Sequence, residues 1–346
     1  MQSEHWTSFL HSISSMVGTF VSILIIFTLF SLLSRFLNRS GKVKMKFQPS
    51  ILPDADGNKE CLPKKAPIIL QINIDGVIGA DDLSLAEVES QLIESQIGAF
   101  SNNRVRGILL KVNSPGGSAV DSDGIYRKLK AYKEKYQIPI YAYVEGYCAS
   151  GGMFIVCAAD KVLSAPSSVI GSIGVRCAFP FLNVHKLLER WEIGSKTIAI
   201  GKHKDHLNPF RPWEEGEDSD LQNLLLQSYN RFVDVVALER KKLTRELLVE
   251  EYGAQIYSAP DAAKLGFIDD GASEYEKALR ELAQASKIGK EETYQVVELV
   301  KKKSPLQELF RTSPLLSGRI KHEIQIGSFN TSPIKGIAYL PLDPYF

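Results

Sequence analysis

The pattern of apolar and polar residues divides the chain into segments of different character. Residues 13–33 are uncharged and mostly apolar, residues 34–66 are basic and interrupted by proline and glycine, and residues 67–285 mix short apolar runs with amphipathic stretches. Residues 286–346 combine a lysine run with a proline-punctuated apolar end. The pattern predicts an N-terminal tail (1–12), a membrane helix, a basic linker, one folded domain and a C-terminal tail of uncertain structure.

Strand-like and helix-like segments alternate within the folded domain. Apolar runs predict strands at 68–74, 105–112 and 138–144. Periodicity of 3.6 residues predicts helices at 83–100, at 119–136 and within 215–250. Strands separated by helices of this length favour βαβ units and a mainly parallel sheet, so the predicted fold class is α/β.

The N-terminal apolar run begins at Ile13 and ends at Leu33. At about 1.5 Å per residue, a helix of this length spans roughly the 30 Å of a bilayer core. A cleaved signal peptide would have a basic region before the run, whereas only Glu4 and two histidines precede it. We therefore expect a retained single-pass anchor in the lipid bilayer.

The charges that flank this run bear on its orientation. Five basic residues follow it and none precedes it: Arg35, Arg39, Lys42, Lys44 and Lys46. The positive-inside rule would keep the C-terminal body in the cytoplasm.

Overall composition excludes several function classes. Lys and Arg number 41 against 40 Asp and Glu, and this near-neutral balance argues against a nucleic-acid partner. The four cysteines form no CxxC pair, so neither a disulfide scaffold nor a zinc knuckle is predicted. Most of the cysteines are expected to be small buried side chains.

Three glycine-rich turns follow predicted strands, where parallel sheets place their sites. The first, NSPGG at 113–117, can point backbone N–H groups at an anion, but no nucleotide-binding motif accompanies it. The second, ASGG, places Ser150 at the start of a helix, as an N-cap or as a nucleophile. The third, GSIG at 171–174, has little meaning alone.

A nucleophilic serine needs a base. Among six histidines, His185 or His203 could complete a Ser-His-Asp set, although neither lies in a distinctive motif. A neutral lysine is the alternative, and its pKa must fall by roughly 3 units from about 10.4, at about 4 kcal/mol, which burial can supply. Lys204 follows a β-like run at 195–200, but its position alone does not select it.

Four motifs in order produce a family resemblance. NSPGGS (113–118), YCASGGMFIVCAAD (147–160), SAPSSVIGSIGV (164–175) and GKHKD (201–205) closely resemble the signal peptide peptidase A family, the S49 serine peptidases. The resemblance covers roughly residues 67–285. It implies a crotonase/Clp-protease-like spiral of ββα units, and a homo-oligomeric ring that cleaves peptides such as signal-peptide remnants without a metal or cofactor.

The resemblance also implies roles for individual residues. Ser150 matches the nucleophile of a Ser-Lys dyad, Lys204 the general base, and Ser172 the serine that orients the lysine. The oxyanion hole matches Gly116, Gly117 and the N–H of Gly151. The family usually places its catalytic domain outside the cytoplasmic membrane of bacteria, so we expect an extracytoplasmic domain despite the flanking charges.

Some features depart from the family pattern, and other functions stay open. Met153 replaces the aromatic residue often found after ASGG, and residues 205–213 match only in part, which bears on substrate preference. The alternatives are a crotonase-like enzyme acting on acyl-CoA thioesters, an inactive membrane scaffold of the same fold, and a Ser-His-Asp protease that uses His203.

Overall fold

The computed structural model describes residues 22, 25–29, 46–63, 65–80, 83–289 and 292–302. No helix in these ranges is long and apolar enough to cross a bilayer. The predicted membrane segment 13–33 lies outside the described residues except at 22 and 25–29, and most of the predicted C-terminal tail also lies outside them.

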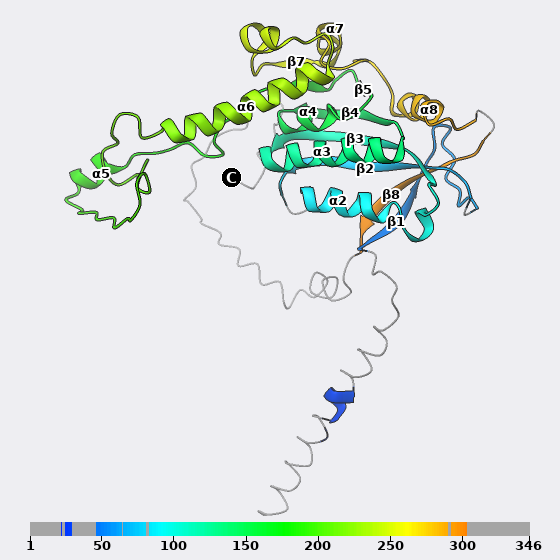
Figure 1. Ribbon diagram of the computed structural model, residues 1–346, viewed down its shortest axis with the longest axis horizontal. Coiled ribbons are helices and arrows are strands. Elements are labelled where there is room, and N and C mark those ends of the chain that lie inside the picture. Colours follow the sequence, from blue (N-terminus) through cyan, green and yellow to red (C-terminus); the bar gives the residue numbers. More distant parts are fainter. Residues whose placement is uncertain are drawn as a thin grey trace, which may run out of the picture. The chain divides into compact units, whose positions relative to one another are not determined.

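The described residues form one eight-stranded mixed sheet with the order β1-β8-β2-β3-β4-β6-β7, and β5 pairs with β4 (Figure 1). The central strands are parallel, while β1 and β7 pair antiparallel with their neighbours. The strands are β1 (Phe47–Leu52), β2 (Ile68–Ile78), β3 (Val105–Gly117), β4 (Ile140–Ala149), β5 (Lys161–Ser164), β6 (Val169–Gly171), β7 (Ile256–Ser258) and β8 (Gln295–Lys301).

Helices cover both faces of the sheet. They are α2 (Leu85–Glu94), α3 (Ala119–Tyr136), α4 (Gly151–Val156), α5 (His185–Arg190), α6 (Ser219–Glu239), α7 (Ala259–Leu265) and α8 (Tyr275–Ala285), with a 3₁₀ turn η1 (Gly98–Phe100) and a π-helical turn η2 (Leu247–Tyr252). The core residues of α2, α3, α4 and α6 belong to one apolar cluster, and those of α8 to a second.

The two clusters explain why β3 has three consecutive apolar residues, 108–110. Ile108 and Leu110 belong to the first cluster, whereas Leu109 between them belongs to the second. Successive strand side chains point to opposite faces, so a parallel strand covered on both sides must be apolar at every position.

Two strands lie outside the boundaries predicted for the folded domain. β1 falls in the predicted linker and β8 in the predicted tail, and they pair with each other from Phe47↔Lys301 to Leu52↔Val296. β8 in turn pairs with the buried strand β2. Pairing across more than 240 residues leaves no local signal in the sequence, and the proline in β1 disguises it further.

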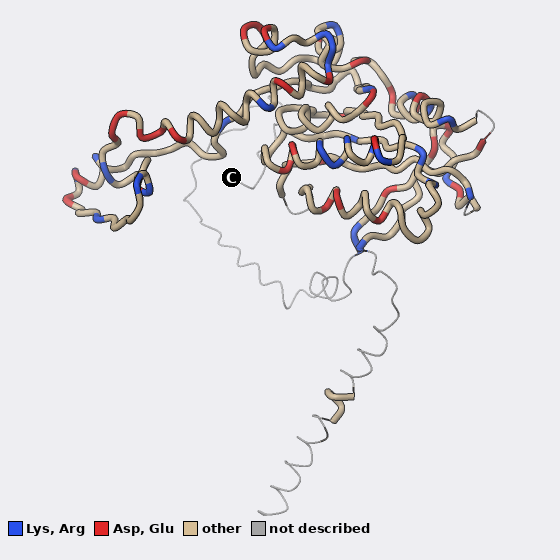
Figure 2. Tube along the Cα trace, viewed as in Figure 1, with Lys and Arg blue, Asp and Glu red and all other residues tan. Residues whose placement is uncertain are grey.

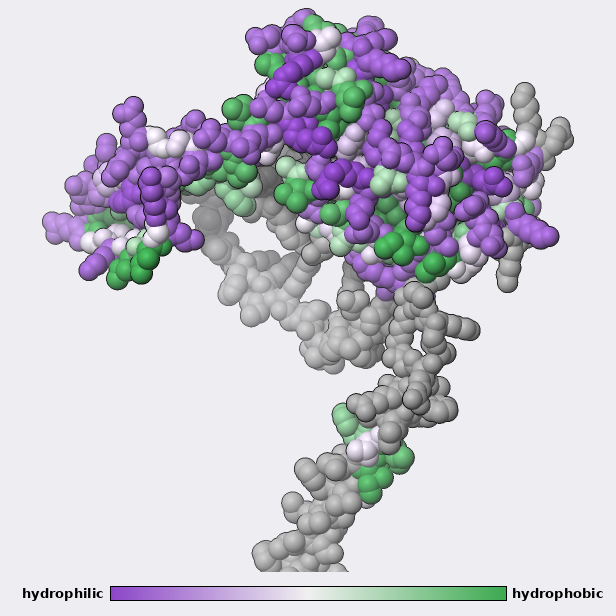
Figure 3. Space-filling view, in the orientation of Figure 1, coloured by the Kyte–Doolittle hydropathy of each residue, from purple (hydrophilic) through white to green (hydrophobic). Residues whose placement is uncertain are grey.

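Residues 174–218 form a segment that we call the arm. In Figure 1 the arm carries α5 and lies at the N-terminal end of α6, beyond the sheet. Glu217 is its only buried residue. Charged residues of both signs are distributed along the arm in Figure 2. Exposed apolar side chains lie among hydrophilic ones in Figure 3.

The four cysteines are all free thiols. Cys148 and Cys157 are fully buried beside the helix α4, where burial raises the pKa of Cys157 to about 11. Cys61 is exposed and Cys177 is half-buried, so the prediction of small buried side chains is confirmed for two of the four.

Candidate active site

The site lies where four neighbouring parallel strands end. The strand register pairs Ile78 with Gly117, Ser114 with Cys148, and Ala149 with Gly171, so β2, β3, β4 and β6 deliver their C-terminal ends to one edge. All three predicted glycine-rich turns leave the sheet at this edge. Parallel sheets commonly place ligand sites there, because the loops that follow the strands converge.

Ser150 occupies the sharp turn between β4 and α4. Its backbone has φ 50° and ψ −119°, a conformation that non-glycine residues rarely adopt and that costs about 1–3 kcal/mol. Its N–H donates to the carbonyl of Gly171 at 2.9 Å, and its carbonyl accepts from Phe154 N at 3.1 Å. The surrounding backbone therefore fixes this turn from both sides.

The Ser150 hydroxyl does not cap the helix that it precedes. No side-chain capping hydrogen bond is formed at the start of α4, in contrast to Ser118, whose Oγ accepts from Asp121 N at the start of α3. Ser150 therefore occupies the N-cap position of α4, but its side chain does not cap the helix. The hydroxyl is left available at a half-buried position that lines the cleft described below.

Gly116 and Gly151 bring backbone close to this hydroxyl. Gly116 has φ +107°, and a Cβ built on it would lie 2.8 Å from Ser150 Cβ and 3.1 Å from Ser150 Oγ. The same Cβ would lie 3.0 Å from Gly151 N. Gly151 is in the first turn of α4, where backbone N–H groups have no helical acceptor and the helix dipole favours negative charge.

Gly117 is close to β2 rather than to the nucleophile. A Cβ on Gly117 would lie 2.1 Å from the carbonyl oxygen of Ile78, so only glycine fits between the strands. The predicted oxyanion residues thus meet around Ser150 through Gly116 and Gly151, with Gly117 shaping the adjoining backbone.

Ser114 positions this loop, and the motif alone did not single it out. Its buried hydroxyl donates to the carbonyl of Gly76 at 2.6 Å and accepts from Gly116 N at 3.2 Å. The bond to Gly116 occupies one of the N–H groups predicted to bind the oxyanion. Gly116 N must therefore exchange this partner, or share it, if it is to contact a substrate carbonyl.

Ser172 lies on the neighbouring strand end, one residue beyond β6. It also has a positive φ, 57°, and its N–H donates to the carbonyl of Gln255 at 2.7 Å. Ser150 and Ser172 line the same cleft. The structure therefore brings the predicted nucleophile and the predicted lysine-orienting serine to one site.

The cleft has a volume of about 1110 Å³ and is bounded by α3, α4, α6 and the start of the arm. Its apolar lining includes Val77, Val120, Phe154, Leu224 and Phe232. An extended peptide with apolar side chains is the kind of ligand that such a surface accepts.

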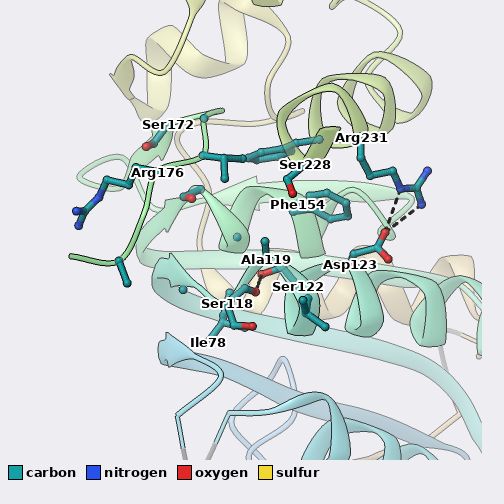
Figure 4. Close-up of a pocket in the computed structure, with 18 of the residues that line it drawn as sticks. Ile78, Ser118, Ala119, Ser122, Asp123, Phe154, Ser172, Arg176, Ser228 and Arg231 are labelled. Carbon is teal, nitrogen blue, oxygen red and sulfur yellow. Dashed lines mark hydrogen bonds and ion pairs between the residues drawn. The ribbon is translucent and has the colours of Figure 1, made fainter. Parts of the chain in front are cut away.

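One wall of the cleft carries an ion pair that sequence reasoning missed. Arg231 reaches from α6 to Asp123 of α3, with Nη2 and Oδ1 3.1 Å apart (Figure 4). The same carboxylate pairs with Arg127 Nε at 2.7 Å. Asp123 and Arg231 are 108 residues apart in the sequence, and no local pattern reports such a contact.

Lys204 does not line this cleft. It lies on the arm in a turn at 201–207, its backbone N–H donating to the carbonyl of Gly201 at 3.3 Å. Its side chain is exposed, and its ammonium group makes no hydrogen bond or ion pair with the described residues. Within one chain, therefore, the predicted base stands apart from the cleft of the predicted nucleophile.

The neighbouring histidine of the same turn has an acidic partner. Nδ1 of His203 lies 2.6 Å from Oδ2 of Asp220, in the first turn of α6. His203, like Lys204, is absent from the cleft lining. His185, the other histidine considered as a base, lies at the start of α5 on the arm and is also absent from this lining.

Comparisons with known proteins agree with this architecture. Residues 132–289 match the model of Peptidase family S49, and residues 82–170 match that of Clp protease. Over residues 82–170 the fold is thus Clp protease-like, within a mixed α/β sheet. A ClpP1 mutant from Listeria monocytogenes covers 60% of this chain and 94% of its own, at 18% identity and a TM-score of 0.41.

Several curated proteins are similar over about half of this chain. A putative protease of Methanocaldococcus jannaschii is 36% identical over 55% of this chain and 60% of its own length. A putative signal peptide peptidase of Enterococcus faecium is 33% identical over 58% and 59% respectively. Protease 4 of Haemophilus influenzae is 28% identical over 50% of this chain and 27% of its own length.

Together the two family models cover residues 82–289, which include the ends of β3, β4 and β6, the ASGG turn and the arm. The chain spans about 60% of the length of the first two relatives. The resemblance that the four motifs predicted is confirmed, because residues 132–289 match the model of peptidase family S49 and the similar curated proteins include proteases and a putative signal peptide peptidase.

Proposed function

We propose that this protein is a serine endopeptidase in which Ser150 is the nucleophile. The observation that carries the proposal is the conformation of Ser150. A non-glycine residue is held at φ 50° between β4 and α4, its hydroxyl does not cap the helix, and it borders a peptide-sized cleft. Strain of this kind persists where the surrounding structure enforces it, and it is common at catalytic positions.

The chemistry follows from the groups around this hydroxyl. A neutral amine takes the proton from Ser150 Oγ as the oxygen attacks the peptide carbonyl. The resulting oxyanion lies against the N–H of Gly151 and the Gly116 backbone, and each such donor contributes about 3–4 kcal/mol. The ammonium then protonates the leaving amine, and water hydrolyses the acyl-enzyme ester.

We assign the base to Lys204 of a neighbouring copy of the chain. Lys204 is exposed on an arm that lies beyond the sheet and has no ionic partner among the described residues, so the described part of its own copy neither desolvates it nor brings it to the cleft. A second copy packed against the arm supplies both conditions, because burial disfavours the charged amine. Ser172, which borders Ser150, then orients the incoming amine.

The arm itself favours assembly. Several of its large apolar side chains are at least half exposed: Phe179, Phe181, Leu182, Trp191, Ile193, Ile198 and Ile200. So many exposed large apolar side chains on one segment are unusual on a monomer and favour a protein interface. A homo-oligomer, closed into a ring, covers these side chains in every copy.

The proposed substrates are extended apolar peptides, including signal-peptide remnants left in a membrane. The apolar cleft lining supports this class, as does the uncharged N-terminal run at 13–33, which would hold the enzyme at the bilayer. We propose that the catalytic domain works on the extracytoplasmic face of a bacterial inner membrane, and protease accessibility in intact cells tests that placement.

A serine-reactive fluorophosphonate probe tests the proposed function. The full chain is expected to form one adduct at Ser150, identified by peptide mass spectrometry, and Lys204→Ala is expected to lose it. Ser228→Ala, on the α6 wall of the same cleft, serves as the matched control. An acyl-CoA enzyme of this fold or an inactive scaffold would leave Ser150 unlabelled in the wild type.

A second candidate is a Ser-His-Asp protease, which the His203–Asp220 pair specifically favours. In such a set the carboxylate orients the imidazole that takes the serine proton. This alternative predicts that His203→Ala abolishes labelling while Lys204→Ala retains most of it. The Ser-Lys proposal predicts the opposite result.

A further inference from the structure

Three potential metal ligands meet at the base of the arm, outside the cleft that contains Ser150. His203 and His206 lie on the turn 201–207, and Asp220 lies in the first turn of α6. One ligand atom from each residue lies within 4.8 Å of the other two. The two imidazole rings stack with their centroids 4.4 Å apart and their planes at 14°.

The contact between His203 and Asp220 aligns two of these ligands. Nδ1 of His203 and Oδ2 of Asp220 are 2.6 Å apart, and the side chains are 40% and 64% exposed. Because both are accessible to solvent, a metal ion can enter without opening the core. Ligand atoms around a tetrahedral zinc are about 3.3 Å apart, as the 2.0–2.2 Å bond lengths require, so small side-chain rotations suffice.

The composition of the cluster selects the class of ion. Two imidazoles and one carboxylate suit zinc and its neighbours in the first transition series, whereas calcium and magnesium prefer oxygen ligands. Three protein ligands leave a fourth position for water. Lys202 and Lys204 flank His203 in the sequence, and their positive charge lowers affinity, so binding in the micromolar range is expected rather than tighter.

We propose that His203, His206 and Asp220 bind one zinc-class divalent cation that fastens the turn 201–207 to the first turn of α6. The site does not depend on peptidase activity. Its place in the chain gives it a consequence, however, because Lys204 lies between the two histidine ligands. A bound ion fixes the turn that carries Lys204 and so restricts where that amine can reach.

Cobalt binding to the full chain tests the site. The chelator-treated protein is titrated with Co²⁺, followed by the visible absorption of four-coordinate cobalt, and Zn²⁺ is then added to displace it. One ion per chain is expected. His206→Gln and Asp220→Asn are each expected to weaken binding by roughly 100-fold or more. His185→Gln, a histidine of the arm outside the cluster, serves as the matched control and retains wild-type affinity.

Trypsin reports on the turn itself, because it cleaves after lysine. Zn²⁺ is expected to slow cleavage after Lys202 and Lys204 in the wild type and in Ser150→Ala, but not in His206→Gln. Cleavage after Lys196, also on the arm, controls for effects of zinc on trypsin. Circular dichroism verifies that each variant is folded. If His206→Gln is not folded, the results for Asp220→Asn decide whether the cluster binds the ion.

The proposal is overturned if the wild type binds no cobalt, or if His206→Gln and Asp220→Asn bind it as the wild type does. A loss of affinity in His185→Gln equal to that in His206→Gln also overturns it. Because cobalt binding is expected to be the same in a Ser150→Ala background, failure here leaves the proposed peptidase function standing.

Discussion

The sheet edge that holds Ser150 and the arm that holds Lys204 differ in what stabilises them. Around Ser150, the strand ends are buried in the main apolar cluster: Ser114, Cys148, Ile170 and Met153 have no exposed surface. In the arm, Glu217 is the only buried residue. One copy of the chain therefore preorganises the proposed nucleophile by its own packing, but does not do the same for the proposed base.

The arm is held instead by a polar cluster. The guanidinium of Arg211 binds Asp205 Oδ2 at 2.6 Å and pairs with both carboxylate oxygens of Glu217. The same carboxylate accepts N–H groups from Leu207 and Glu214, each at 2.8 Å. Polar bonds of this kind set the path of the loop, but they leave its apolar side chains uncovered for a partner.

The largest expected effect is that of replacing Ser150, at the sheet edge. Ser150→Ala is expected to lower kcat/KM for a peptide substrate by roughly 10⁵–10⁶-fold, because it removes the nucleophile. Thermal unfolding stays at or above the wild-type temperature, since the hydroxyl caps nothing. Ser90→Ala, on α2 and outside the cleft lining, is the control and keeps normal activity. Retention of a tenth of wild-type activity in Ser150→Ala would refute the assignment.

On the arm, Lys204→Ala is expected to lower kcat/KM by about 10²–10⁴-fold, the usual contribution of a general base. Its thermal unfolding is expected to match the wild type, because the side chain is exposed and makes no ion pair within the part of the chain that the structure describes. His203→Ala is the matched neighbour and keeps most of the activity. If His203→Ala proves the more damaging change, the base is the histidine.

Gly116→Ala tests whether the Ser150 turn depends on close backbone contact. The added Cβ would meet Ser150 Cβ at 2.8 Å at a residue with φ +107°. We expect unfolding free energy to fall by about 1–3 kcal/mol and activity to fall by about 100-fold. Gly194→Ala, on the arm, has open space around it and no positive φ, and its stability should be unchanged. Equal effects of the two substitutions would show that the contact at Gly116 is unimportant.

The smallest expected effect is a loss of stability of the folded arm at low pH. Hydrogen bonds from Arg211 lower the pKa of Glu217 to about 2, against about 4.3 in an unfolded chain. A lowered carboxyl pKa stabilises the folded arm above pH 4.3, and this contribution is lost as the pH falls from about 4 to 2. Fluorescence of the arm tryptophans, Trp191 and Trp213, should report that transition.

Glu217→Gln removes the titrating group, so its arm is expected to be loosened already at pH 7 and to show no further transition between pH 4 and 2. Glu215→Gln, at an exposed neighbouring position, should behave as the wild type. An acid transition that persists in Glu217→Gln would assign it to another group.

The elements with local signals were predicted well. The helix at 119–136 has the predicted bounds, because Ser118 caps its start and Gln137 ends it in the left-handed conformation. The strands at 68–74 and 105–112 were predicted too short, since β2 and β3 continue into the turns that form the site. β1 and β8 could not be predicted as partners from sequence, because their pairing joins opposite ends of the folded region.

In the candidate site, too, the features with a local sequence signal were predicted and those that depend on tertiary structure were not. The ASGG and NSPGG motifs led to Ser150 and Gly116, which the strand register brings together. The backbone strain at Ser150, the Asp123–Arg231 pair and the His203–Asp220 pair are tertiary features, and residue type alone does not report them. The exposure of Lys204 on the arm is also a tertiary feature, which the GKHKD motif does not report.

The most direct test of the account combines two inactive variants in one assembly. Chains carrying Ser150→Ala and chains carrying Lys204→Ala are co-expressed with different tags, and assemblies containing both are purified in sequence on the two tags. If Ser150 of one copy works with Lys204 of another, some sites receive both intact residues, and about a quarter of wild-type activity returns in an evenly mixed assembly. If activity stays at the level of either variant alone, the dyad does not form between copies, and the proposed role of the arm is wrong.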